Sequence, residues 1–313
     1  MTVAPDIVRA PRPFPPPRQS DPYPSRTSSV PSISPRHDPV LHGGTGAPGP
    51  LSPDELRAYE RDGFLFFDRF LSLNEVAALR SEMETLWRSA GPDDEAVIRE
   101  PGGDTMRSIF RIHETSPVFA QLARDRRVVT MAEQLLASGV YIHQSRINFK
   151  PGFDGKEFYW HSDFETWHAE DGMPRMRAVS VSIALSDNTP LNGPLMIIPG
   201  SHRYFVSCVG ETPEDHYRSS LRRQEYGVPD HECLTRLVKN AGAIAAPAGK
   251  AGSLLLFECN AMHGSNGNIT PDPRSNVFFV YNSVENALTA PFAGTRPRPD
   301  FVATREPRPI VPD

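Results

Sequence analysis

The chain has 313 residues, of which 38% are hydrophobic, and a formal net charge of -5. This length and composition can bury a sizeable core, as one large domain or two small ones. The mild acidity argues against nucleic acid as a partner. The longest apolar runs, residues 254–257 and 277–281, fall far short of the roughly 20 residues that cross a bilayer. We therefore expect no membrane association and a small-molecule ligand.

Proline is concentrated at the two ends of the chain. Of 33 prolines, 13 lie in residues 1–50 and six in residues 291–313. Proline lacks the backbone N–H that helices and central strands require. Residues 1–20 are therefore predicted to be a disordered extension without chemistry, and the chain is predicted to end in a proline-rich tail.

The three cysteines indicate a reducing compartment. Their number is odd, and their spacing fits neither a disulfide framework nor a thiolate metal site. The N-terminal stretch also lacks the continuous apolar segment of a secretory signal. We expect a cytoplasmic protein.

Regular structure is predicted to begin with helices. Ser52, Pro53 and Glu55 form a capping box with proline at the first helical position, and this helix should end at Gly63. A second capping box, Ser72 with Glu75, opens an amphipathic helix. A third helix is expected from about residue 117 to 137.

The character of the sequence changes after residue 138. From Tyr141 to Tyr281 short β-type runs alternate with Gly, Pro, Asn and Asp clusters, which is typical of an all-β sandwich or barrel. We expect strands at residues 179–185, 195–198, 253–257 and 277–281. The predicted fold is mainly β with flanking helices: a helical part at about 51–138, a jelly-roll core at about 139–290, and the tail, within one domain at 21–313.

A candidate metal site begins at His161 and Asp163. In a strand, residues i and i+2 point to the same face, so an imidazole and a carboxylate would converge. A facial triad for non-haem iron(II) needs one more histidine, and His263 is the natural candidate. The H-x-D triplet alone is weak, because a hydrogen-bonded surface pair explains it equally well.

Arg274 strengthens this interpretation. It lies eleven residues after His263, at the start of an expected strand, and its fork of donors suits a dicarboxylate. The alternative is an exposed loop arginine after Pro273.

The same residues carry a family resemblance. The strings QSRINFKPGFDGKEFYW (144–160) and HSDFETWHAEDGMP (161–174) closely resemble the signature region of ectoine hydroxylases, a branch of the phytanoyl-CoA dioxygenase-like superfamily. The resemblance extends to DPYPSR, RDGFLFF, NGPLMIIPGSH and HGSNGN, and it covers nearly all of the chain except the first twenty residues. It implies a double-stranded β-helix of the cupin-like kind.

The resemblance also implies a role for each site residue. His161, Asp163 and His263 would bind Fe(II), and the acidic ligand favours hydroxylation over halogenation. The cosubstrates would be 2-oxoglutarate and O2. Lys150, Arg274, Ser180 and Ser265 would hold 2-oxoglutarate, although Lys150 could be a surface lysine and the two serines ordinary polar positions.

The implied substrate is L-ectoine, a cyclic amidine with a carboxylate. Gln144, Trp167 and Arg298 would contact it, although Trp167 would also suit a protein core. Phe110, Phe158, Phe257 and Phe278 would line the pocket or serve as packing. His168 and His202 are interpreted as structural residues, and the remaining histidines receive no role.

The implied reaction hydroxylates ectoine to 5-hydroxyectoine with release of succinate and CO2, in a homodimer that serves osmotic and thermal stress protection. Two alternatives stay open from sequence. One is a related oxygenase acting on another small amino-acid derivative or on an acyl-CoA. The other is a non-enzymatic cupin-like binding module or a metal-dependent isomerase.

Overall fold

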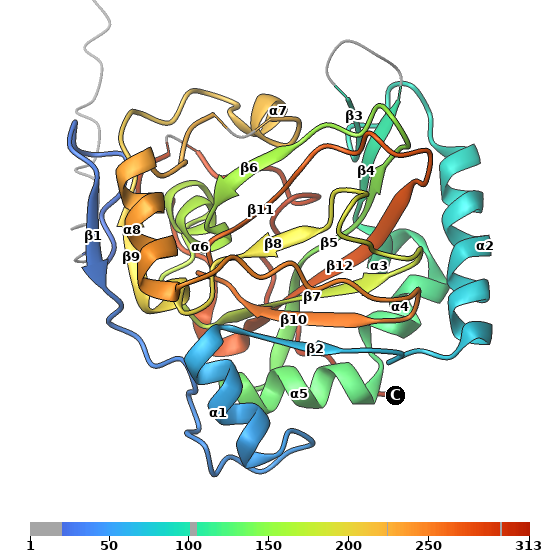
Figure 1. The fold of residues 1–313 in the computed structure, drawn as a ribbon, viewed down its shortest axis with the longest axis horizontal. Helices are drawn as coiled ribbons and strands as arrows, with labels where there is room; N and C mark the ends of the chain where they lie inside the picture. The colour runs from blue at the N-terminus through green and yellow to red at the C-terminus, as the bar shows by residue number, and fades with distance from the viewer. Residues whose placement is uncertain (1–20, 101–104, 224, 295) are drawn as a thin grey trace, which may run out of the picture.

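The fold is built around two facing antiparallel sheets, seen in a computed structural model that describes residues 21–100, 105–223, 225–294 and 296–313 (Figure 1). The predicted extension at residues 1–20 lies outside the described residues. The major sheet has seven strands in the order β2-β10-β7-β12-β5-β4-β3. Its strands are β2 (Phe64–Phe67), β10 (Leu254–Glu258), β7 (Ala178–Ala184), β12 (Arg274–Ser283), β5 (Val140–Lys150), β4 (Met106–Phe110) and β3 (Val97–Arg99).

The minor sheet supplies the second wall. It has three strands in the order β6-β11-β8, namely β6 (Phe158–His161), β11 (His263–Ser265) and β8 (Leu195–Ile197). A separate pair joins β1 (Ser32–Pro35) to β9 (Tyr204–Ser207). This arrangement confirms the predicted jelly-roll, a double-stranded β-helix.

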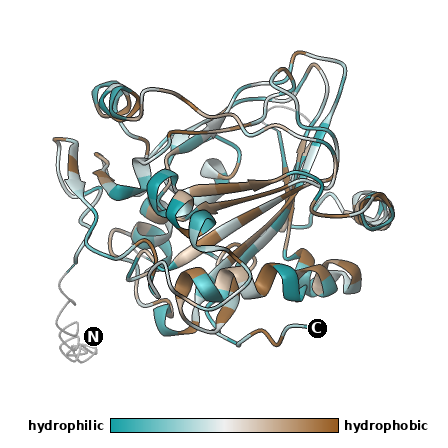
Figure 2. Ribbon diagram, turned by 60° about the horizontal axis from the view of Figure 1, so that its bottom comes forward, coloured by the Kyte–Doolittle hydropathy of each residue, from teal (hydrophilic) through white to brown (hydrophobic). Residues whose placement is uncertain are grey.

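Helices cover the outer face of the major sheet (Figures 1 and 2). The helices of the N-terminal part are α1 (Pro53–Asp62), α2 (Leu73–Ser89), α3 (Ile112–Thr115), α4 (Pro117–Ala123) and α5 (Arg126–Leu136). Both predicted capping boxes are present, at Ser52 and Ser72, and Gly63 ends α1 in a left-handed conformation. The single helix predicted at 117–137 is wrong in detail, because Asp125 caps a new helix and divides the segment into α4 and α5.

In the major sheet, alternate side chains point to the apolar core and to the inside of the jelly-roll. In β7, Val179, Val181 and Ile183 belong to the apolar core shared with the helices, whereas Ser180 and Ser182 alternate with them and are also buried. Alternate side chains point to opposite faces of a strand. The polar side chains of this sheet are therefore directed to the inside of the jelly-roll.

Several elements were not predicted. The part expected to be helical also contributes β2, β3 and β4 to the major sheet, and the β-rich part contains α6 (Asp163–Thr166), the π-helix η1 (Trp167–Asp171), α7 (Tyr217–Ser220) and α8 (His231–Ala241). Two 3-10 turns, η2 (Ser201–Arg203) and η3 (Val284–Asn286), complete the elements. The tail packs along β5, where Thr304 and Ile310 donate backbone hydrogen bonds to His143 and Val140.

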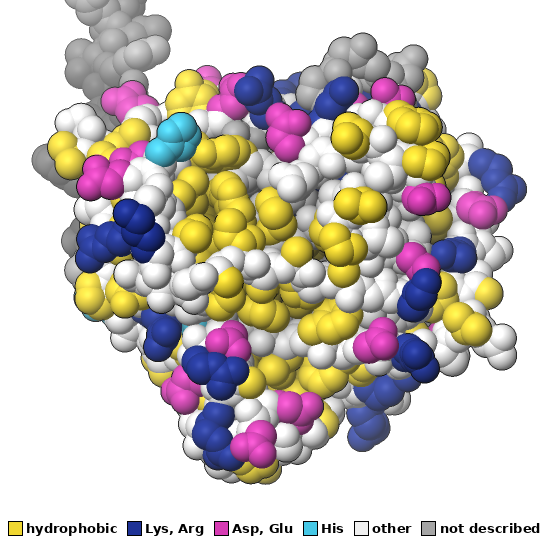
Figure 3. All heavy atoms as spheres, in the orientation of Figure 1, with side chains coloured by type: hydrophobic (Ala, Val, Ile, Leu, Met, Phe, Trp, Pro, Cys, Tyr) yellow, Lys and Arg dark blue, Asp and Glu magenta, His cyan; other side chains and the backbone are white. Residues whose placement is uncertain are grey.

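On the face drawn in Figure 3, charged side chains gather toward the periphery, while hydrophobic ones lie near the centre. Across the described ranges, every helix is too short or too polar to cross a membrane. Cys208, Cys233 and Cys259 are buried free thiols.

Candidate metal centre and its pocket

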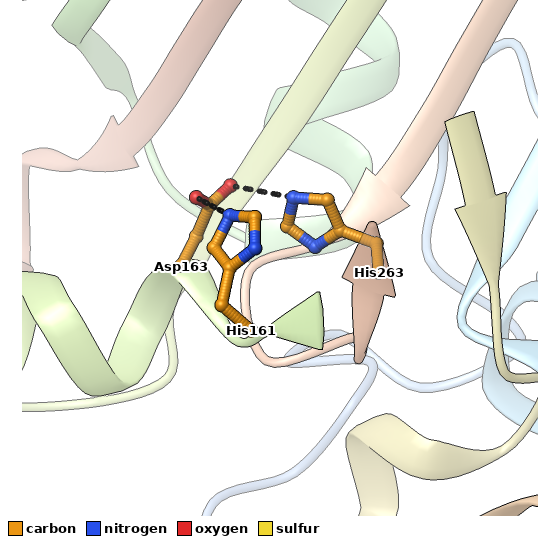
Figure 4. Close-up of side chains that lie close together, drawn as sticks. All are labelled: His161, Asp163 and His263. Carbon is orange, nitrogen blue, oxygen red and sulfur yellow. Dashed lines mark ion pairs between the residues drawn. The ribbon is translucent and has the colours of Figure 1, made fainter. Parts of the chain in front are cut away.

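His161, Asp163 and His263 converge inside the jelly-roll. One ligand atom from each lies within 4.8 Å of the others, and all three side chains are buried. The Nε2 atoms of His161 and His263 face the two carboxylate oxygens of Asp163 at 3.6 and 3.8 Å (Figure 4). Two imidazoles and one carboxylate on one side of a point are the donor set of a facial iron(II) site.

The local structure differs from the predicted one. Both histidines lie on paired strands, since His263 of β11 is directly opposite His161 of β6. The strand ends at His161, however, and Asp163 is the first residue of α6, which Ser162 caps. The expectation that one strand presents His161 and Asp163 was therefore wrong, and a strand-to-helix turn brings the carboxylate to the same point.

Hydrogen bonds fix which imidazole nitrogen can bind a metal. Nδ1 of His161 bonds the carbonyl of Tyr159 at 2.8 Å, and Nδ1 of His263 bonds that of Ala261 at 2.9 Å. Each Nδ1 must donate to its carbonyl, which leaves Nε2 as the lone-pair donor. Burial followed by the neighbouring His161 lowers the pKa of His263 to about 4, so its ring is neutral at pH 7. Burial alone would raise the pKa of Asp163, but His263 and His161 bring it below its ordinary value. These residues fit a divalent cation.

Strands β5 and β12 place two cationic side chains in the same pocket as the triad. Lys150 and Arg274 are cross-strand partners, and both are buried. The Lys150 amine donates to Ser265 Oγ at 2.9 Å and to the carbonyl of Asn266 at 2.5 Å. Nε of Arg274 is buried without a hydrogen-bond partner. Burial, then the neighbouring Arg274, lowers the pKa of Lys150 to about 7, and burial with Arg107 lowers that of Arg274 to about 10.

Arg146 is a third cation that the sequence reasoning missed. It lies between the rings of Phe110 and Phe278, with its guanidinium 5.8 and 5.0 Å from their centroids. Among the residues that the structure describes, Arg146, Lys150 and Arg274 form no ion pair with a carboxylate. Lys150 and Arg274 are buried and Arg146 is partly buried, and a cation removed from water is stabilised by a compensating anion. The pocket is therefore built to receive anionic groups.

A signal for Arg146 was present in the sequence. In residues 144–150 polar side chains occupy every second position, with Ile147 and Phe149 between some of them. In a strand, such alternation places Gln144, Arg146 and Lys150 on one face. All three line the pocket that contains the triad.

The three residues predicted to bind the substrate, Gln144, Trp167 and Arg298, are buried and line the same pocket as the triad. Gln144 precedes Lys150 on β5. The Gln144 amide donates to the carbonyl of Val302 at 2.7 Å. Arg298 is held by Asp171 through Nε at 2.7 Å and Nη2 at 2.6 Å. Its charge is therefore already compensated, which sequence reasoning did not anticipate.

The other predicted residues divide into two groups. Phe110, Phe158, Phe278 and Ser265 line the pocket. Ser180 and Phe257 do not: Ser180 donates to Asp163 at 3.5 Å, and Phe257 packs edge-on against the His263 ring. Both residues therefore contact metal ligands. The prediction that Phe257 lines the pocket is wrong.

The helix that carries Asp163 is anchored by buried ion pairs. We call Arg26, Glu165, Glu170, Asp171, His216 and Arg298 the helix-anchoring cluster. Arg26 binds Glu165 at 2.7 Å and Glu170 at 2.6 Å, and His216 bonds Glu170 at 2.7 Å. The Arg26 backbone has a φ of +56°, a conformation that costs free energy in a non-glycine residue. Segments from both ends of the chain thus fix the short run α6–η1.

Two further histidines have structural roles, as predicted. His168 bonds the carbonyl of Met173 at 2.7 Å and Asp21 at 2.8 Å. His202 bonds the carbonyl of Glu60 at 3.2 Å. His216, to which the sequence assigned no role, belongs to the helix-anchoring cluster.

The fold and the site together define a non-haem iron oxygenase of the jelly-roll class. Comparison with known proteins agrees. The phytanoyl-CoA dioxygenase (PhyH) family matches residues 59–276. The ectoine dioxygenase of Bordetella bronchiseptica is 56% identical over 287 residues, covering 91% of this chain and 93% of the relative.

Solved structures give the same result. EctD from S. alaskensis with 2-oxoglutarate and 5-hydroxyectoine is 49% identical, with a TM-score of 0.85 over 94% of this chain and 98% of that chain. The form with bound Fe is 48% identical, with a TM-score of 0.83 over the same shares. The chain belongs to the phytanoyl-CoA dioxygenase family and, within it, to the ectoine dioxygenases.

Proposed function

We propose that the chain is an Fe(II)- and 2-oxoglutarate-dependent dioxygenase that hydroxylates L-ectoine to 5-hydroxyectoine. The observation that carries this function is one pocket that combines the iron-type triad with three inward-facing cations. A metal site alone would suit many proteins. Cations without carboxylate partners beside it call for a dianionic cosubstrate and a substrate with a carboxylate.

The metal contributes the oxidative chemistry. When bound, Fe(II) activates O2 together with 2-oxoglutarate, which leaves as succinate and CO2 while the substrate is hydroxylated. His161, Asp163 and His263 would hold this ion. Their Nδ1 hydrogen bonds and the Ser162 cap of α6 keep the three donors aligned.

Lys150 and Arg274 would bind the distal carboxylate of 2-oxoglutarate. They lie opposite each other on β5 and β12, so a carboxylate between them receives donors from both sides. Ser265 would add its hydroxyl, since it already bonds the Lys150 amine. Ser180 would act through Asp163, which its hydroxyl contacts.

Ectoine would lie at the opposite end, against Trp167, Gln144 and Arg298. The indole of Trp167 offers a π face to the delocalised amidinium, and Arg298 offers a cation to the carboxylate through the guanidinium edge turned away from Asp171. Phe110, Phe158 and Phe278 would exclude water from this space.

The experiment is anaerobic reconstitution with Fe(II), followed by ectoine, 2-oxoglutarate and air. We expect succinate and 5-hydroxyectoine in equal amounts, with little succinate when ectoine is omitted. Absence of ectoine-dependent succinate, with metal and 2-oxoglutarate bound, would overturn the proposal. Turnover of another small amino-acid derivative or an acyl-CoA would then identify the alternative oxygenase.

We further propose that residues 21–313 act as one domain, in a cytoplasmic homodimer that serves the stress response. β2 of the N-terminal part joins the major sheet, and the tail bonds to β5, which supports one domain. The buried free thiols suit a reducing compartment. The dimer rests on the family resemblance, and light scattering on the purified chain tests it.

A further inference from the structure

Part of the pocket wall comes from a segment that belongs to neither sheet. Ser220, at the end of α7, and Leu221 line the pocket together with the triad and Trp167. Ser220 is buried and Leu221 is partly buried. We call residues 212–221 the mouth segment. It lies outside the two sheets (Figure 1), so its position depends on specific contacts.

Polar contacts fix the first half of the mouth segment. His216 bonds Glu170 at 2.7 Å, and Thr212 accepts a hydrogen bond from Arg26 at 3.2 Å. His216 is buried, and its ring packs edge-on against Tyr226 at 5.2 Å. Glu170 is in η1, three residues after Trp167. The mouth segment is thus attached to the helical run that presents Trp167 to the substrate end of the pocket.

An aromatic chain supports the second half. The Tyr217 ring meets Phe301 of the tail at 6.1 Å, and Phe301 meets Phe110 at 6.3 Å. Phe110 is itself a pocket residue. Ser220 and Leu221 are three and four residues after Tyr217, so these contacts help to fix the position from which they reach the pocket.

From these contacts we propose that Ser220 and Leu221 are specificity-determining residues, which limit the ring size of the substrate, and that His216 is the positioning residue that holds them. This inference rests on the proposed function and deepens it. Phe110, Phe158 and Phe278 bound the pocket from the two sheets, whereas Ser220 and Leu221 bound it from a segment outside them. An aliphatic side chain held in this part of the wall can limit the size of the ring, because a bulkier ring must displace it.

The first test compares ectoine with its seven-membered-ring homologue, which carries one more methylene. We expect Leu221→Ala to raise the homologue-to-ectoine ratio of kcat/KM by about tenfold, the lower end of what one methylene decides in a closed pocket. Leu221→Phe should lower the same ratio. The matched control is Leu73→Ala, which removes an exposed leucine from α2, and its ratio should equal that of the unaltered chain.

The second test addresses His216. His216→Phe keeps the ring against Tyr226 but loses the bond to Glu170, whereas His216→Asn keeps a donor near the Nδ1 position. We expect His216→Phe to raise KM for ectoine several-fold and to relax the ratio, with KM for 2-oxoglutarate unchanged. His216→Asn should restore both. A merely structural histidine would instead change both KM values or only the melting temperature.

The outcomes separate the two proposals. Ectoine turnover by the unaltered chain, with a ratio that stays within about twofold in every Leu221 variant, overturns the inference and leaves the function intact. No ectoine turnover by the unaltered chain overturns both. If Leu221→Ala fails to fold, Leu221→Phe and the His216 pair still decide the question.

Discussion

The major sheet and the run α6–η1 are stabilised in opposite ways. The sheet packs Val181, Ile183, Val277 and Phe279 against helices, with no charged group in this cluster. Besides the metal ligand Asp163, the α6–η1 run buries three carboxylates, those of Glu165, Glu170 and Asp171, and each is paired with an arginine from elsewhere in the chain. Apolar packing tolerates small changes of shape, whereas a buried ion pair does not tolerate the loss of one partner. We therefore expect the major sheet to tolerate substitutions better than the α6–η1 run, which carries the metal ligand Asp163.

The largest effect should come from the metal ligand itself. Asp163→Ala removes the carboxylate of the triad and leaves two histidines to hold the metal, so hydroxylation should fall to background. The sheet does not depend on this side chain, and circular dichroism and the apo-protein melting temperature should stay close to those of the unaltered chain. Near-full activity of this variant would show that the triad is misassigned.

Next in size is a change in the helix-anchoring cluster. Arg298→Met leaves Asp171 buried without its guanidinium, and we expect the free energy of unfolding to fall by about 3–5 kcal/mol. Urea denaturation measures this.

The control is Arg88→Met, which breaks an exposed pair with Glu84 on α2 and should cost at most about 0.5 kcal/mol. Equal losses for the two variants would show that the buried pair is no more important to stability than the exposed one.

A smaller effect is expected from pH at the cosubstrate end. The pKa of Lys150 is lowered to about 7, chiefly by burial. Its ammonium is present below that pH and lost above it, and a dianion binds better to the charged form. The affinity of the iron-loaded protein for 2-oxoglutarate should therefore decrease as pH rises above about 7, by at most about tenfold per pH unit.

Calorimetric titration under nitrogen at pH 6 to 9 tests this. Lys150→Arg provides the control, because arginine stays protonated across the range. An equally steep decrease in that variant would assign the effect to another group.

The smallest effect should come from the sheet interior. Ile183→Val removes one methyl group from a buried position of β7, and we expect a loss of about 1 kcal/mol in the free energy of unfolding. The kinetic constants should not change, because Ile183 points to the helices and away from the pocket. A lower kcat would show that the two faces of the sheet are coupled.

Local signals in the sequence predicted part of this structure well. The capping boxes at Ser52 and Ser72 involve residues three apart, so no distant contact is needed to define them. Asp230 and Gly242 are equally good start and stop signals for α8, but they stand inside a region whose sequence is otherwise typical of β-structure. By contrast, β2 is only four residues long and is defined by pairing with β10, far along the chain.

The site was predictable where residue type alone restricts the chemistry. The triad and Arg274 were found from spacing and family likeness, even though Asp163 lies on a helix and not in a strand. The helix-anchoring cluster could not be found in this way. Arg26 and Glu165 are 139 positions apart, and Arg298 and Asp171 are 127 apart. Nothing local marks such partners, because the fold brings them together.

The spread of the helix-anchoring cluster along the chain has a consequence for synthesis. Arg26 leaves the ribosome before any of the three metal ligands, and Arg298 leaves it after all of them. A chain cut short between His263 and Arg298 possesses all three metal ligands, yet Asp171 lacks its arginine and the helix bearing Asp163 lacks one anchor. Competence to hold iron in a productive geometry is therefore acquired only after translation has passed the last metal ligand and reached Arg298.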